Sequence, residues 1–138
     1  MTNDERWFPS HLKELGEPEC LELLAEHHVG RVAYCDDLGP VVLPVNYAVD
    51  QGNILIQTSP HSTLASRLRT APASFQIDEF DEYTQTGWSV LVRGSAAYVD
   101  PTDLPADEDR QHTWAEGQRS LQIRITPHEI SGRRLLPA

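Results

Sequence analysis

The sequence predicts a small, mainly β-stranded domain, in which six or seven strands and two or three short helices form a closed or half-closed antiparallel barrel. Its 138 residues fit one domain, and 39% hydrophobic with 23% charged residues is typical of a folded globule. Runs in which apolar and polar residues alternate occupy most of the chain, and turn sequences rich in Gly, Pro, Asp and Asn separate them.

The first part of the chain is expected to be non-strand. Residues 1–16 are predicted to form an irregular arm before a single domain of residues 17–138. A helix is expected over residues 18–29, where Pro18 suits the first helical position and Gly30 can end the helix. The residues that share one face at helical spacing are Cys20, Leu21, Leu24, Ala25 and His28.

Strands are expected to dominate the rest of the domain. The stretch 41–49 alternates regularly, and Asp50–Asn53 is a turn that can begin a hairpin with the next strand. Gly94 marks a bulge or a bend within a long strand. A short helix is expected at 60–69, and a helix or a loop at 101–110. The predicted strands are 31–35, 41–49, 54–58, 73–78, 88–99, 121–125 and 130–135.

The formal net charge of −10 excludes some classes of partner. A field of this sign repels nucleic-acid phosphates and anionic membrane surfaces, so neither is an expected partner. No apolar run approaches the roughly 20 residues of a membrane helix, and the first residues lack the order of a secretory signal. A cytoplasmic protein is therefore expected. The acidic run Asp78–Glu82 is interpreted as a solvated loop.

Searches for familiar catalytic and metal-binding motifs find none. Cys20 and Cys35 form neither a C-x-x-C pair nor a zinc-spaced cluster, so two reduced, partly buried thiols are expected. The six histidines make no H-x-x-x-H or H-E-x-x-H pattern, and no metal site is predicted. No G-x-S-x-G, Walker or G-x-G-x-x-G sequence occurs.

A phosphate site is one interpretation of the segment Thr58–Thr63, which ends a strand and opens a helix. Pro60 sets the backbone for a helical start, and Ser59 is placed to cap it. Hydroxyls and free backbone N–H groups would then gather at the positive end of a helix dipole, with Arg67 on the same helix. For this segment taken alone, an ordinary capped helix is the favoured interpretation, and the phosphate site stays open as the alternative.

Two strand segments and the tail add weaker indications. Pro44 interrupts a strand and could expose backbone groups to the edge of a flat heteroaromatic ring. Trp88 could cover an aromatic ligand or seal a dimer interface, although a core tryptophan is commoner, and Ser89 points the other way. Arg133 and Arg134 suggest an anion contact or an intersubunit ion pair, with a solvated chain end as the alternative.

Taken in this order, these segments resemble small proteins of the pyridoxamine 5′-phosphate oxidase-like, FMN-binding split-barrel family. The resemblance covers roughly residues 17–135 and rests on Pro44–Tyr47, Thr58–Pro60, Gly87–Gly94 and Gly132–Arg134. It implies a six-stranded antiparallel split β-barrel of Greek-key type. It also implies a homodimer with two FMN molecules in clefts between the subunits.

The resemblance implies three groups of cofactor-binding residues. Those that would line the isoalloxazine ring are Val45, Asn46 and Tyr47. Those that would hold the ribityl phosphate are Thr58, Ser59, Ser62 and Thr63. The remaining contacts would come from Trp88, Ser89 and, from the partner chain, Arg133.

One position departs from the family pattern. Many relatives carry a lysine near Thr63, and its loss removes a positive charge beside a dianion, for which Arg67 could compensate. A deazaflavin coenzyme, or no cofactor, therefore remains an alternative to FMN. The substrate-binding pattern of the true oxidase near the C-terminus is not evident, so vitamin B6 oxidation is not predicted.

The function expected from this resemblance is a flavin-dependent oxidoreductase acting on an unknown small conjugated substrate, in which the cofactor supplies the chemistry. Three alternatives remain: a deazaflavin-dependent reductase, a non-catalytic flavin-binding or storage protein, and a cofactor-free interaction protein.

Overall fold

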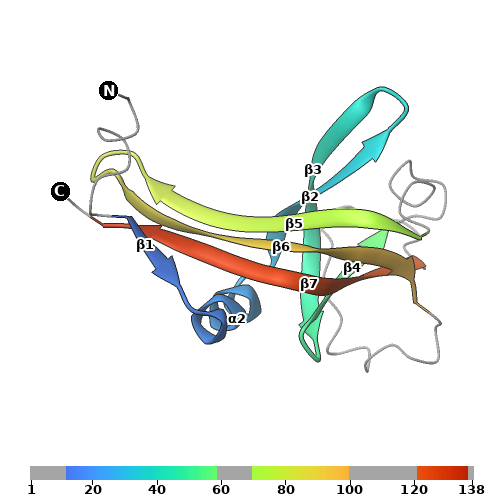
Figure 1. The fold of residues 1–138 in the computed structure, drawn as a ribbon, viewed down its shortest axis with the longest axis horizontal. Helices are drawn as coiled ribbons and strands as arrows, with labels where there is room; N and C mark the ends of the chain where they lie inside the picture. Colours follow the sequence, from blue (N-terminus) through green and yellow to red (C-terminus); the bar gives the residue numbers. More distant parts are fainter. Residues whose placement is uncertain (1–11, 59–69, 100–120, 137–138) are drawn as a thin grey trace.

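The computed structural model describes residues 12–58, 70–99 and 121–136 (Figure 1). Over these residues the chain is almost entirely strand, with one helix at the start. The elements in order are β1 (Leu12–Leu15), α2 (Glu17–Glu26), β2 (Val29–Asp36), β3 (Gly39–Asp50), β4 (Asn53–Thr58), β5 (Thr70–Asp81), β6 (Thr86–Tyr98) and β7 (Leu121–Leu135).

Six of the strands close into a ring, which confirms the predicted split barrel. The sheet runs β1-β7-β4-β3-β2-β5-β6, and an additional β6–β7 pairing joins its ends. All pairings are antiparallel. β2, β3 and β4 form a meander and β5 returns to lie beside β2, which is the Greek-key connection. In Figure 1, β5, β6 and β7 run side by side along the longest axis, and the β2–β3 hairpin stands away from them.

Alternation along the strands fills the barrel interior with apolar side chains. Tyr47 and Phe75 meet there edge to face, with ring centroids 4.7 Å apart. Helix α2 packs on this core through Cys20 and Leu24, and the Tyr47 hydroxyl donates a 2.6 Å hydrogen bond to the Leu24 carbonyl oxygen. Other fully buried side chains of the interior are Val32, Ile54, Ile56, Val90, Val92, Ile123 and Ile125.

The turn between β3 and β4 sets the register of that hairpin, as predicted. Gln51 and Gly52 both have positive φ, 52° and 81°, which is the requirement of a two-residue type I′ turn. The turn pairs Asp50 with Asn53 and therefore Tyr47 with Ile56. Every second residue of the two strands consequently faces the interior.

Two strand predictions need correction at the ends of the sheet. Residues 12–15, expected within an irregular arm, form β1 and pair with Gly132–Leu135. The separate strands predicted at 121–125 and 130–135 are one continuous strand, β7, which passes through Pro127. It can do so because the ladder contains a bulge at this point. Arg93 pairs with Glu129 and the next residue, Gly94, pairs with Pro127, so His128 of β7 is the extra residue. The bulge predicted at Gly94 is confirmed.

Helix α2 ends earlier than predicted, at Glu26. Gly30 lies inside β2 and not at a helix end. A Cβ at this position would overlap the ring of Phe75, so a larger residue does not fit there. Ala25 and His28, expected on the buried face, are exposed. The predicted acidic loop begins later than expected, since Asp78–Asp81 continues β5.

Both thiols are free in this structure. Cys20 is buried on the inner face of α2, and desolvation, followed by the charges of Glu19 and Glu17, raises the pKa of its thiol. Cys35 is exposed, which differs from the partly buried position expected. The helix or loop segments predicted at 60–69 and 101–110 lie outside the described residues. In the part of the chain that is described, no helix is long and apolar enough to cross a membrane.

Candidate functional site

The predicted ring-binding segment lies on β3, next to α2. Val45 and Asn46 are half-buried and pair with Gly30 and Val29 of β2. The side chain of Tyr47 is fully buried in the core, so a contact from that ring to a ligand remains a prediction without structural support of its own. Thr58, at the end of β4, is buried.

The remaining members of the predicted phosphate site, Ser59, Ser62, Thr63 and Arg67, lie outside the described residues. Their role therefore stays a prediction.

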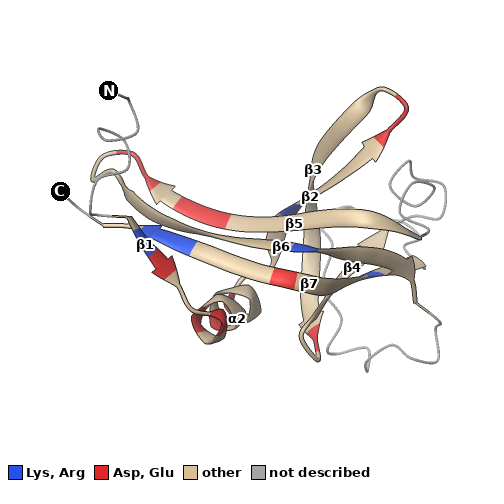
Figure 2. Cartoon of the chain, in the orientation of Figure 1, with Lys and Arg blue, Asp and Glu red and all other residues tan. Residues whose placement is uncertain are grey.

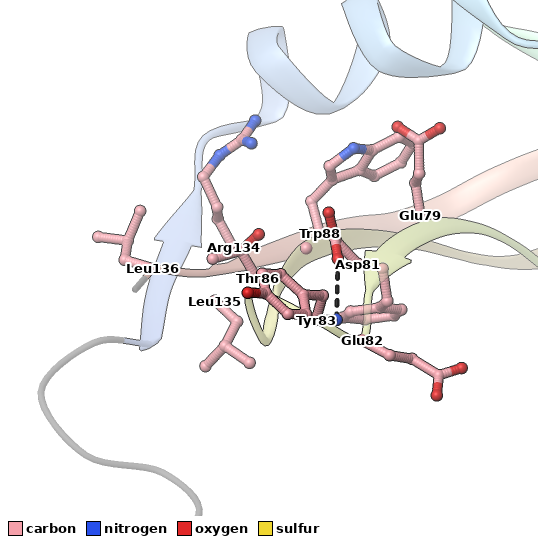
Figure 3. Close-up of a pocket in the computed structure, with 11 residues that line it drawn as sticks. Glu79, Asp81, Glu82, Tyr83, Thr86, Trp88, Arg134, Leu135 and Leu136 are labelled. Carbon is pink, nitrogen blue, oxygen red and sulfur yellow. Dashed lines mark hydrogen bonds between the residues drawn. The ribbon is translucent and has the colours of Figure 1, made fainter. Parts of the chain in front are cut away.

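Trp88 belongs to the core wall, with 7% of its surface exposed. Its indole packs at a tilt on the ring of His27, with centroids 5.0 Å apart, and His27 Nδ1 lies 2.7 Å from the Leu23 carbonyl oxygen. Trp88 is therefore a core tryptophan, which was the commoner of the alternatives considered for it from the sequence. One edge of the residue still lines an open hollow of about 1060 Å³ at the end of the sheet, shown in Figure 3.

That hollow, here called the acidic hollow, is bordered by Glu79, Asp81 and Glu82 around the turn between β5 and β6. Asp81 holds the turn by accepting a 2.9 Å hydrogen bond from the Tyr83 backbone N–H, drawn as the dashed line in Figure 3. On the opposite side, Arg134 forms a 3.3 Å ion pair with Glu19 of α2. The carboxylates therefore outnumber the cations that line this hollow.

Ser89 and Arg133 lie together on the outer surface of the barrel. They are directly opposite each other across the β6–β7 ladder, and both line a groove of about 940 Å³. We call it the β6–β7 groove. Its apolar walls come from four side chains: Leu12, Phe80, Leu91 and Leu135. The structure therefore brings together these two predicted residues, which lie 44 positions apart in the chain.

Charge is concentrated around this groove. Figure 2 shows the basic end of β7 bordered by acidic stretches of β1, α2 and β5. Arg133 itself has no hydrogen-bond or ion-pair partner among the described residues, and neither does the Ser89 hydroxyl. An arginine and a hydroxyl that have no partner in the described part of the chain, beside apolar walls, are suited to a flat ligand with polar edges.

Sequence reasoning missed Gln76 and Asp78 of β5, which approach the same region. Asp78 accepts hydrogen bonds from Arg31 Nη1 at 2.9 Å and from Gln76 Nε2 at 3.0 Å. Gln76 lines the β6–β7 groove, where Leu91 pairs with it across the ladder. The signal was the polar alternation of residues 74–78 opposite Phe75 and Ile77, which the predicted loop at Asp78 obscured.

The two halves of the predicted site lie on opposite sides of the barrel. β3 and β6 are three strands apart in either direction around the ring of six. Val45 and Asn46 of β3 are thus not brought next to Ser89 of β6 within one chain.

Comparison with known proteins relates this architecture to one family. The family model described as pyridoxamine 5′-phosphate oxidase matches residues 16–134. Among solved structures, a candidate pyridoxamine 5′-phosphate oxidase from Corynebacterium glutamicum is 29% identical, with a TM-score of 0.75 over 95% of this chain and 98% of its own.

Two similar structures are described as FAD-binding proteins. The one from Mycobacterium smegmatis is 27% identical, with a TM-score of 0.69 over 89% of this chain and 97% of its own. The one from Mesorhizobium loti is 25% identical, with the same TM-score and the same coverages. The fold is therefore that of known flavin-binding proteins.

Proposed function

The chain belongs to the pyridoxamine 5′-phosphate oxidase family, and from this premise we propose that it binds a flavin and acts as an oxidoreductase on a small conjugated substrate. The β6–β7 groove is the observation that carries the proposal. An isoalloxazine ring has apolar faces and a polar edge, and the groove offers apolar walls beside Ser89 and Arg133. The residues present therefore fit the group.

In this proposal the protein positions the ring and the bound flavin supplies hydride transfer. Leu91 and Phe80 cover apolar surface of the ring and exclude water from it. Arg133 places a fixed positive charge beside the ligand, which favours electron-rich, anionic forms of the ring system. Ser89 contributes a hydroxyl that can donate or accept.

We propose that the complete site forms between two copies of the chain. The ring-binding residues of β3 and the Ser89–Arg133 pair face different sides of one barrel, so a single chain cannot direct both at one ligand. A second copy placed across the β6–β7 groove can supply the missing half. The family resemblance likewise implies a homodimer with intersubunit clefts, but there Arg133, and not the β3 residues, would come from the partner chain.

FMN is the proposed cofactor, and FAD is its first competitor because two similar structures are FAD-binding proteins. A deazaflavin coenzyme is the third possibility, since Thr63 stands where many relatives carry a lysine. A cytoplasmic location is part of the same proposal.

The proposal is tested by titrating the purified protein with FMN, FAD and riboflavin and following flavin fluorescence. Arg133→Gln is expected to weaken binding of the preferred flavin by about ten- to a hundredfold, the cost of one charge-assisted contact. Arg93→Gln is the matched control, because Arg93 lies on the same sheet in an exposed 3.5 Å pair with Glu129. Binding unchanged in Arg133→Gln would contradict the assignment of the groove.

A second measurement separates an enzyme from a carrier. Protein loaded with the preferred flavin is mixed anaerobically with NADH or NADPH, and bleaching of the flavin absorbance is recorded. Reduction followed by reoxidation with an added quinone supports the oxidoreductase. The whole proposal would be contradicted if the protein bound neither FMN, FAD or riboflavin nor a deazaflavin.

A further inference from the structure

A short chain of polar side chains crosses β2 and β5 beside the β6–β7 groove. Asp78 is at its centre, with 18% of its side chain exposed, and it accepts from both Arg31 and Gln76. Arg31 pairs with Gln76 across the β2–β5 ladder, so the three side chains share the outer face of the barrel. Neither the motifs of the sequence nor the proposed flavin contacts account for this arrangement.

The arrangement fixes the direction of the Gln76 carboxamide. An ionised aspartate only accepts hydrogen bonds, so the NH₂ group of Gln76 must face Asp78. Arg31 holds the aspartate side chain in place, because the guanidinium lies 2.9 Å from the same carboxylate oxygen. The carboxamide oxygen of Gln76 is then directed away from Asp78. It has no hydrogen-bond partner among the described residues.

Gln76 therefore adds a neutral acceptor to a groove whose other polar side chains are Glu14, Ser89, Ser131 and Arg133. It lies on β5, Ser89 on β6 and Arg133 on β7, and all three line the same groove. Ser89 pairs with Arg133 on one side and with Asp78 on the other, which places it between the other two strands. Two strand spacings span roughly 9–10 Å, a distance that the long side chains of Gln76 and Arg133 can close from both sides.

The imide edge of an isoalloxazine ring has the complementary pattern. It presents a carbonyl oxygen, an N3–H donor and a second carbonyl oxygen. We propose that the Gln76 carboxamide oxygen accepts a hydrogen bond from the flavin N3–H, while Ser89 and Arg133 donate to the flanking carbonyl oxygens. Gln76 is then a specificity-determining residue, oriented by Asp78 and Arg31. This inference rests on the proposed flavin site and adds the residue that reads the edge of the ring.

The test compares FMN with 3-methyl-FMN, in which the N3–H is replaced by a methyl group. Dissociation constants are measured by fluorescence for the unmodified protein, Gln76→Leu and Asp78→Asn. The unmodified protein is expected to prefer FMN by about tenfold or more, since 3-methyl-FMN leaves the glutamine oxygen unpaired. Gln76→Leu is expected to weaken FMN binding about tenfold, to leave 3-methyl-FMN binding nearly unchanged and so to abolish the preference.

Asp78→Asn keeps the glutamine but lets its carboxamide turn, because asparagine can donate as well as accept. We expect this variant to lose most of the preference with Gln76 intact. Ser74→Ala, on the same face of β5 but outside the groove, is the control and should keep it. Far-ultraviolet circular dichroism and melting temperature confirm that the variants are folded.

The outcomes separate this inference from the flavin proposal. If the unmodified protein binds no flavin, both are overturned. If it binds FMN but Gln76→Leu weakens both ligands equally, or neither, only the role of Gln76 is overturned. A tenfold preference that persists in Gln76→Leu would likewise overturn that role alone.

Discussion

At the scale of single residues, Tyr47 illustrates how one side chain can serve the fold where a ligand contact was expected. Its ring is fully buried against Phe75, and its hydroxyl donates to the last buried turn of α2 through the Leu24 carbonyl oxygen. Burial disfavours the phenolate, so desolvation raises the pKa of Tyr47 well above its usual value. The hydrogen bond ties the helix to β3, beside the residues expected to line the flavin ring.

This burial predicts a specific alkaline loss of stability. A folded-state pKa above the unfolded value of about 10 means that the unfolded chain releases the proton first. The contribution of Tyr47 is therefore complete below about pH 10 and declines as the pH rises toward the folded-state pKa. We expect the free energy of unfolding to fall between pH 8 and pH 11 by about 1.4 kcal/mol more in the unmodified protein than in Tyr47→Phe.

Urea denaturation at the two pH values measures the difference. At pH 8, Tyr47→Phe should already be less stable by about 1 kcal/mol, the net worth of one hydrogen bond. Tyr83→Phe is the control, because Tyr83 is 97% exposed and should not change the pH dependence. Equal alkaline losses in Tyr47→Phe and the unmodified protein would contradict the proposed cause.

At the scale of elements, the β6–β7 pair organises both the barrel and the groove. Gly94 lies at the bulge of this pair, and a Cβ at that position would overlap the carbonyl oxygen of Thr126. Backbone atoms on both strands cannot move aside as a side chain can. The bulge also shifts the register, so that Ser89 meets Arg133 farther along the ladder.

Gly94→Ala is expected to destabilise the protein by about 1–3 kcal/mol, the usual cost of an overpacked site. The change is measured as the free energy of unfolding in urea. Gly16→Ala serves as the comparison without overlap, because the nearest atom to its added Cβ is a proline carbon at 3.7 Å. Gly16 is the N-cap of α2, where Ala is less favourable than Gly, so a loss of about 0.5–1 kcal/mol is expected there. A loss below about 0.5 kcal/mol in Gly94→Ala would mean that the strands separate easily there.

The elements of the barrel were largely predictable from sequence because its interior is apolar and its strands alternate. The stretch 41–49 and the Gln51–Gly52 turn followed from local pattern alone. β1 and the continuity of β7 through Pro127 did not, since both depend on pairing with residues distant in the chain. Local patterns carry no signal for such partners.

The candidate site was predictable only in part. Ser89 and Arg133 entered through the family resemblance, and the fold then placed them opposite each other. Gln76 and Asp78 carried no motif, and their significance arises from the 3.0 Å hydrogen bond between them and from the neighbouring strands. Tyr47 shows the reverse case, since its apolar spacing equally indicated the core position that the structure shows.

At the scale of the whole molecule, the ring of strands separates the two halves of the proposed site. The outer face of β2, β3, β5 and β6 carries apolar side chains that remain partly exposed in a single chain, including Val42 of β3 at 60%. We propose that a second copy covers this face and completes the site. The polar Arg31–Asp78 pair lies within it and would fix the orientation of the two copies.

Light scattering of the purified protein at micromolar concentration is expected to give twice the mass of the chain. Leu91→Arg, which places a charge in the centre of this face, should give a monomer that remains folded. Glu22→Arg introduces the same side chain on the exposed surface of α2 and should remain a dimer. A monomeric unmodified protein would contradict the intersubunit site, although not the barrel.

β7 contacts three other strands, β1, β4 and β6, and it is the last of them in the chain. During translation the earlier strands therefore leave the ribosome with no means of closing the ring. Until residues 121–135 emerge, the nascent polypeptide exposes open sheet edges and half of its future interior, which are the features that chaperones bind. The barrel described here therefore cannot close before β7 has emerged.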